Sequence, residues 1–202
     1  MNGAFLKSVA FGLAVAASIG PIALLILGTA ATRGLAAGCF AALGAALADF
    51  TFALLAFSAG AWALPLLAAH AQAVRIVAAC VLIGFAFAMI VREIRAGGAT
   101  EAAASRPSGA LLSTFLLTLV NPMTIVIFAG FVPQLPLAGS LPTAAWLAAG
   151  LFAGSLAVQL ALAISGRLLG AALPGRGWRR SINLAGGAGI FAFGVAGLLS
   201  SS

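Results

Sequence analysis

Charged residues are scarce in this chain. Only 6% of its 202 residues are charged, whereas 63% are hydrophobic. A soluble domain has about 25% charged and about 45–50% apolar residues. There are too few polar residues to cover so much apolar surface in water. The composition therefore excludes a soluble fold. The apolar runs are long and do not alternate, which predicts an all-α integral membrane protein embedded in the lipid bilayer rather than a barrel.

Cysteine, histidine and acidic residues are also few. The chain has two cysteines, one histidine and three acids. Cys39 and Cys80 fall in apolar runs, where they are expected to act as small buried hydrophobes, and no spacing of metal ligands is present. No nucleophile–base pair is visible either, so we expect no metal, no cofactor and no enzyme activity. The net charge of +7 does not indicate nucleic-acid binding, because the basic residues lie in short loops beside apolar segments.

Six segments are long and apolar enough to cross a membrane. A membrane-spanning helix needs about 20 apolar residues. In the first segment an apolar run follows Lys7, as in a signal peptide, but this run exceeds the about 7–15 residues of a signal sequence. The predicted spans are Phe5–Gly28, Leu35–Gly60, Gln72–Val91, Leu111–Val132, Thr143–Ser165 and Ile182–Leu199.

The basic residues predict the orientation of the chain. If the N-terminus lies outside, Lys7 and Arg75 are on the outer side and the other eight of the ten basic residues are on the inner side. Loops on the cytoplasmic side carry an excess of Lys and Arg. We therefore predict a multi-pass protein of the inner (plasma) membrane of the cell, with both termini outside.

A charged segment rich in small residues, 92–109, divides the chain into residues 1–91 and 110–202. Its composition is that of a flexible cytoplasmic linker. Each part holds three predicted spans. Because three is odd, the second part begins on the opposite side of the membrane. The sequence therefore predicts two inverted three-helix repeats, an architecture common in secondary transporters.

Each predicted repeat has a helix breaker deep in its first span. Gly20 and Pro21 interrupt the first span, and Asn121 and Pro122 interrupt the fourth. Proline removes a backbone donor and frees the carbonyl that it would have met. In lipid such groups need other partners, unless they line a hydrated cavity. Paired interruptions of this kind predict a substrate site where the two breaks meet.

The second span of each repeat carries a polar residue at a comparable depth. Asp49 is the sole acid within a predicted span, and Gln159 occupies the related place in the fifth span. A charge at mid-membrane costs about 2.5–3.5 kcal/mol on insertion scales, which makes Asp49 a functional candidate. Thr118 shares a helical face with Asn121, and Ser155 lies four residues before Gln159. The predicted substrate-binding residues are Gly20, Pro21, Asp49, Thr118, Asn121, Pro122 and Gln159.

Spaced small residues predict close helix packing. The pairs are Gly34 with Gly38, Gly44 with Ala48, and Gly150 with Gly154. The glycine-rich faces also allow a homodimer.

Two stretches resemble the signatures of the LysE/RhtB-type translocators, exporters of amino acids and related metabolites. The first, at 20–49, has spaced glycines between a Gly-Pro and an acid. The second, at 121–135, opens with Asn-Pro and continues through aromatic residues to Pro-Gln. The matching residues are Gly20, Pro21, Gly34, Gly38, Gly44, Asp49, Asn121, Pro122, Phe128, Phe131, Pro133 and Gln134. The chain departs from the family pattern at Ile19, where a proline is usual, and at Met123, where a lysine is usual.

The resemblance implies a secondary transporter that exports amino acids or similar small metabolites. We expect protons to be the coupling ion, with Asp49 as their carrier, and half-helix N-termini to favour a carboxylate of the substrate. Two alternatives remain. A divalent-cation exporter of the same superfamily would need more acids or soft ligands in its spans. A non-transporting membrane subunit would fit the loss of the lysine at Met123.

Overall fold

The computed structural model describes residues 2–17, 20–95, 107–121, 124, 127–128, 140–172 and 175–199. Every regular element within these ranges is an α-helix, which confirms the all-α prediction. The predicted site residue Pro122 lies outside the described ranges, as do Met123 and the motif residues Phe131, Pro133 and Gln134.

The first predicted span is two helices. α1 covers Asn2–Ala17 and α2 covers Pro21–Arg33. The axes of the two helices meet at a bend of 76°. Proline suits the first position of a helix because the N–H that it lacks would have no partner within that helix. Pro21 therefore starts a new helix instead of kinking an existing one.

The other helices are longer than the predicted spans or shifted from them. α3 covers Leu35–Ala69 and α4 covers Ala71–Arg95, and α5 follows at Pro107–Leu119. α7 covers Leu141–Ala172 and α8 covers Arg176–Leu199. The ends of the predicted linker, at 92–95 and 107–109, are thus helical.

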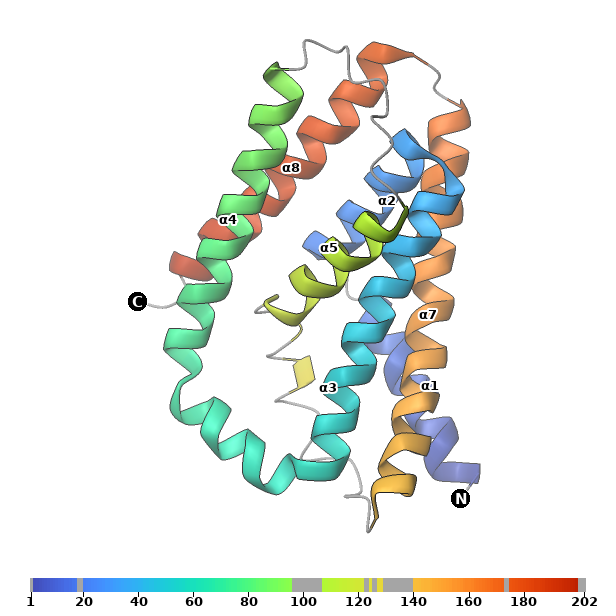
Figure 1. The fold of residues 1–202 in the computed structure, drawn as a ribbon, viewed down its shortest axis with the longest axis vertical. Coiled ribbons are helices and arrows are strands. Elements are labelled where there is room, and N and C mark those ends of the chain that lie inside the picture. Colours follow the sequence, from blue (N-terminus) through green and yellow to red (C-terminus); the bar gives the residue numbers. More distant parts are fainter. Residues whose placement is uncertain are drawn as a thin grey trace.

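Two of these helices are long and apolar enough to cross a membrane. They are α7 and the stretch Leu35–Ser58 of α3, and the bent pair α1–α2 makes a third if it is one span. The rest of α3 turns away from the line of its first part (Figure 1). The structure thus gives the chain apolar spanning helices, while the full set of six stays a prediction.

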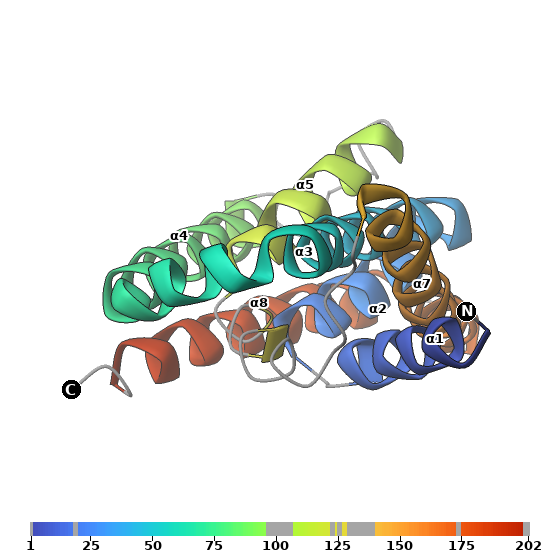
Figure 2. The same ribbon diagram turned by 90° about the horizontal axis from the view of Figure 1, so that it is seen from below.

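α3 and α7, here called the central helices, run antiparallel and side by side, with α1 beside α7 and α5 beside α3 (Figures 1 and 2). α2 packs against both central helices and against α8, and α8 pairs with α4. Within that pair the Asn183 amide donates a hydrogen bond of 2.9 Å to Glu93 Oε2.

Glycines let the helix backbones approach closely. A Cβ on Gly44 of α3 would collide with the carbonyl oxygen of Leu111 on α5. A Cβ on Gly154 of α7 would collide in the same way with the carbonyl oxygen of Val9 on α1. The predictions for Gly44 and Gly154 are therefore confirmed.

The prediction that Gly34 packs against a neighbouring helix is wrong. Gly34 ends α2 with φ +92°, where its N–H donates to the Ala30 carbonyl at 3.0 Å. Nothing lies within 4 Å of the place where its Cβ would be. Glycine is favoured here because this backbone conformation penalises a side chain.

Candidate functional site

The break between α1 and α2 leaves backbone donors without a side-chain cap. Gly20, the residue before α2, has an extended backbone and offers no side-chain hydrogen bond to the helix start. The first N–H groups of a helix have no partner within it, and the helix dipole places partial positive charge there. Gly20 is itself buried. A break of this kind provides hydrogen-bond donors in the interior of the protein.

A second break follows α5. The helix ends at Leu119, and Asn121 is buried with 5% of its surface exposed. The Asn121 side-chain amide donates to Thr124 Oγ1 at 3.1 Å, and its backbone N–H donates to the Thr118 carbonyl at 3.2 Å. These two bonds connect Asn121 to the residues on both sides of the break.

Phe128, a motif residue after the second break, packs among other aromatic rings. Its ring stacks on Phe52 of α3 at 5.2 Å and meets the edge of Phe11 of α1 at 5.7 Å between centroids. These contacts tie the segment beyond the break to two helices of the first half of the chain, α1 and α3.

Asp49 is the acid of the site. Its side chain is 2% exposed, and Ser155 on α7 donates a hydrogen bond of 2.6 Å to Oδ2. Ser155 is fully buried and is 106 residues away in sequence. The bond joins α3 to α7, so the two central helices meet through a polar contact at the predicted acid.

Gln159 lies one turn after Ser155 on α7. It is 5% exposed, and its Oε1 is a buried oxygen with no hydrogen-bond partner within the described residues. A buried acceptor without a partner costs about 1–3 kcal/mol. Such an atom is a place where a ligand or water can supply the missing donor.

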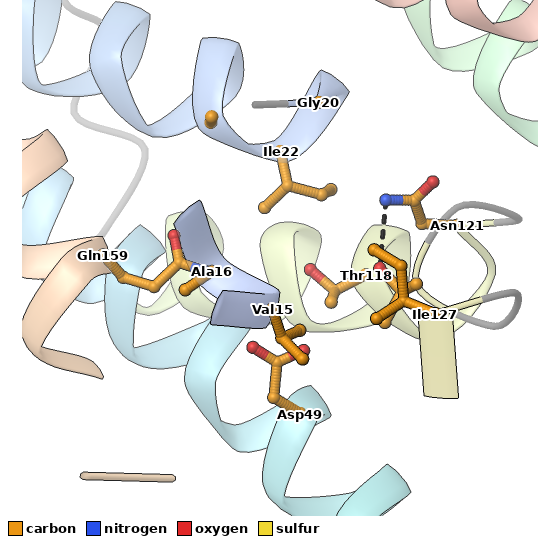
Figure 3. Close-up of a pocket in the computed structure, with 11 residues that line it drawn as sticks. Val15, Ala16, Gly20, Ile22, Asp49, Thr118, Asn121, Ile127 and Gln159 are labelled. Atoms are coloured by element: carbon orange, nitrogen blue, oxygen red, sulfur yellow. Dashed lines mark hydrogen bonds between the residues drawn. The ribbon is translucent and has the colours of Figure 1, made fainter. Parts of the chain in front are cut away.

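These residues surround one cavity (Figure 3). Figure 3 shows Gln159 and Asp49 reaching it from different helices, with Thr118 and Asn121 on a further wall. Its volume of about 30 Å³ has room for about two water molecules. A larger solute needs the helices to separate. The lining residues are Val15, Ala16, Gly20, Ile22, Ala23, Asp49, Thr118, Asn121, Thr124, Ile127 and Gln159.

The structure brings most of the predicted site together. Gly20, Asp49, Thr118, Asn121 and Gln159 all line the cavity. Pro21 is fully buried at the start of α2 but is not among the lining residues.

Sequence reasoning did not assign the apolar part of the lining, which includes Val15 and Ile22, or the role of Ser155. Val15 belongs to one buried apolar cluster of the protein and Ile22 to the other, so the cavity lies where the two clusters meet. Spacing offered a signal for Ser155 alone, because it precedes Gln159 by one helical turn.

The cavity wall is poor in charge. Of its lining residues Asp49 is the sole ionisable one. In the part of the chain that the structure describes, no group of three His, Cys, Asp or Glu side chains is placed to hold a metal ion. The site is therefore suited to binding a small polar solute through hydrogen bonds and one carboxyl group.

Comparison with known families decides the class of the protein. The family model of the LysE type translocators matches residues 13–201. The chain belongs to the LysE type translocator family. This confirms the resemblance found in the two sequence stretches. The match covers α2 to α8 and the last part of α1, so both breaks and all lining residues of this translocator fall within it.

Searches among curated proteins and among solved structures each found no match. Family membership makes this LysE type translocator a membrane exporter of amino acids or metabolites. Translocators of this type move solutes instead of converting them, which agrees with the expectation that the chain is not an enzyme.

Proposed function

We propose that this chain exports a small amino-acid-like metabolite across the cytoplasmic membrane in exchange for protons, by alternating access. The observation that carries the proposal is the cavity at the two helix breaks, which holds the one acid of the predicted spans. The bilayer penalises a buried charge and uncapped backbone groups, so both are retained where they bind cargo.

Matched contacts in the two halves support a pair of inverted repeats. The Gly44 contact on Leu111 joins α3 to α5, and the Gly154 contact on Val9 joins α7 to α1. Gly44 precedes Asp49 by five residues, and Gly154 precedes Gln159 by five. In each half, the glycine that makes the close helix contact is therefore separated from the cavity residue by the same number of residues. This is the relation expected of two copies turned over about an axis in the membrane plane.

The arrangement of the helix ends supports the proposed orientation. The end of α2, the end of α4 and the start of α8, which carry most of the arginines, lie at one end of the molecule, and the N-terminus lies at the other (Figure 1). Basic residues collect on the cytoplasmic side. We therefore place the arginine-bearing end inside the cell.

Labelling of single cysteines tests this orientation. In a background with Cys39→Ala and Cys80→Ala, Gly3→Cys and Gly177→Cys each add a thiol where no other group lies within 4 Å. A membrane-impermeant maleimide should label Gly3→Cys in intact cells and Gly177→Cys only after permeabilisation. The reverse pattern contradicts the proposed orientation.

Asp49 accounts for the coupling in this mechanism. When the site is open to the outside, the Asp49 carboxylate takes up a proton. The site can then open to the inside without carrying a net charge. Open to the inside, Asp49 releases the proton as the solute binds. An Asp49 carboxylate that has bound neither a proton nor the solute is charged, and moving this charge across the membrane interior is costly. The empty transporter therefore changes conformation slowly.

A transport assay tests the proposed function. In proteoliposomes that are acidic inside, the purified protein should accumulate a radiolabelled amino acid above its equilibrium level, and a protonophore should abolish this accumulation. Common amino acids and dipeptides form the panel. If none accumulates, the proposal fails. If labelled manganese accumulates instead, the cation-exporter alternative holds, and if no solute moves, the chain is a non-transporting subunit. The mass of the purified particle in the same preparation tells whether the chain forms the homodimer that its glycine-rich faces allow.

A further inference from the structure

Two polar side chains of the cavity, those of Thr118 and Asp49, present hydrogen-bond acceptors to it. The Thr118 hydroxyl donates its hydrogen to the Thr114 carbonyl at 2.8 Å, which leaves the lone pairs of its oxygen as acceptors. An ionised Asp49 only accepts, and one of its oxygens already receives the Ser155 hydroxyl. Thr118 is 2% exposed. The polar wall formed by these two residues therefore needs a donor from a bound molecule.

Gln159 adds an acceptor that the protein leaves unpaired. Its Oε1 is buried and has no partner within the described residues, and its side chain lines the same cavity as Asp49 and Thr118. Buried polar atoms in proteins nearly always have a hydrogen-bond partner. An exception at a cavity wall points to a missing ligand.

The helix register explains why Gln159 Oε1 lacks a donor. α3 and α7 are antiparallel and are joined by the bond between Asp49 and Ser155. Ala45 lies one turn before Asp49 on α3, and Gln159 lies one turn after Ser155 on α7. Because the helices are antiparallel, Ala45 and Gln159 are neighbours across the interface. Ala45 is fully buried and has no hydroxyl to donate. Asp49 thus receives a hydroxyl across the interface, whereas Gln159 does not.

We propose that the cavity recognises the primary ammonium group of the solute, held by Asp49, Thr118 and Gln159, and that a carboxylate on the solute is dispensable. An ammonium has three donors and a positive charge, which match three acceptors of which one is a carboxylate. No lysine, arginine or histidine is among the lining residues to hold a carboxylate as an ion pair. The inference rests on the proposed export function and specifies its substrate class.

This assignment also gives the proton exchange a physical basis. A protonated Asp49 and an Asp49 carboxylate paired with the ammonium of a solute that has no carboxylate have the same net charge of zero. Both forms can cross the low-dielectric interior, whereas the unpaired carboxylate cannot do so cheaply. Proton and ammonium are therefore alternative partners of one carboxyl group.

Modified solutes test the inference directly. Radiolabelled leucine, alanine and phenylalanine are each offered to the acid-inside proteoliposomes as the free amino acid, the amide and the N-acetyl derivative. Amides keep the ammonium and lose the carboxylate, and N-acetyl derivatives do the reverse. We expect amides to be transported comparably to the parent compounds and N-acetyl derivatives to be slower by about a hundredfold or more, since they leave the buried carboxylate unpaired.

Variants of the polar wall supply the second measurement. Thr118→Val and Gln159→Leu each remove one acceptor and should raise KM for the amide by about tenfold or more, as expected for a hydrogen bond to a charged group. Thr114→Val is the matched control, because Thr114 is as buried but does not line the cavity, and its KM should not change. Ala45→Ser offers Gln159 an internal donor and should also raise KM, while Ala41→Ser on the same helix should not.

The possible outcomes separate the two proposals. Transport of N-acetyl derivatives at the rate of the parent compounds, or rejection of the amides, overturns the ammonium assignment and leaves the export function standing. An unchanged KM in Thr118→Val and Gln159→Leu removes those residues from recognition and also counts against the assignment. If no compound moves in the wild-type protein, the export function itself is contradicted.

Discussion

Asp49→Asn is expected to abolish proton-driven accumulation of the solute while the protein remains folded in the membrane. The amide of asparagine has nearly the shape of the carboxyl group, but it does not take up and release a proton and it carries no charge. The Ser155 hydroxyl, which donates to Asp49 at 2.6 Å in the wild type, can donate to the amide oxygen of the variant. The helix contact therefore survives, and the coupling group is lost.

The stability of this variant should change little or increase. Replacing a buried carboxyl with a neutral group removes the cost of an ion in a low-dielectric interior, which is several kcal/mol when the ion is poorly paired, or about 2.5–3.5 kcal/mol on insertion scales. The apparent melting temperature of the purified protein in detergent measures this. Lost transport together with unchanged or raised melting temperature separates a chemical role from a structural one.

Glu93→Gln is the matched control for Asp49→Asn. Glu93 is the other acid that is buried among the described residues, with 9% exposed, and it accepts a bond from Asn183 between α4 and α8. It does not line the cavity. We expect full proton-driven transport in Glu93→Gln. If Asp49→Asn accumulates solute as the wild type does, Asp49 has no part in coupling.

The residues that sequence alone could identify share a local physical cause. Pro21 interrupts a helix because of its own ring, and a neighbouring glycine adds to the effect. Asp49 stands out because an acid in an apolar segment is costly wherever the segment packs. Neither inference needs knowledge of the tertiary contacts. Asp49 lines the cavity, and Pro21 directly follows the lining residue Gly20.

The residues that sequence could not identify depend on packing between distant segments. Ser155 became a partner of Asp49 because α3 and α7 cross at that point, and 106 residues separate the two. Gly34 could not be told from a packing glycine, because both roles favour a missing side chain. The apolar lining of Val15 and Ile22 gives no signal in a chain with so many similar residues. The sequence pattern therefore identified most of the polar lining residues of the cavity. The apolar lining and the role of Ser155 depend on how the helices pack.

Gly44→Ala and Gly154→Ala are expected to destabilise the protein strongly and to similar extents. In each case the new Cβ would collide with a backbone carbonyl oxygen, that of Leu111 or that of Val9. A backbone oxygen cannot rotate aside as a side chain can, so the helices must move apart. Overpacking of this kind costs about 1–3 kcal/mol, occasionally more. The yield of monodisperse protein and its apparent melting temperature report the loss.

Gly84→Ala on α4 is the control, because nothing lies within 4 Å of its added Cβ. It should be neutral or stabilising by up to about 1 kcal/mol, since alanine favours a helix more than glycine does. The Gly44 and Gly154 contacts share no partner, so the double variant should show the sum of both losses. If the two contacts are related copies of one helix contact, the two substitutions should lower the stability by similar amounts, and these losses should add. If either substitution is as harmless as Gly84→Ala, the backbones are not in close contact there, and the matched packing that holds the two broken helices against the central pair is contradicted.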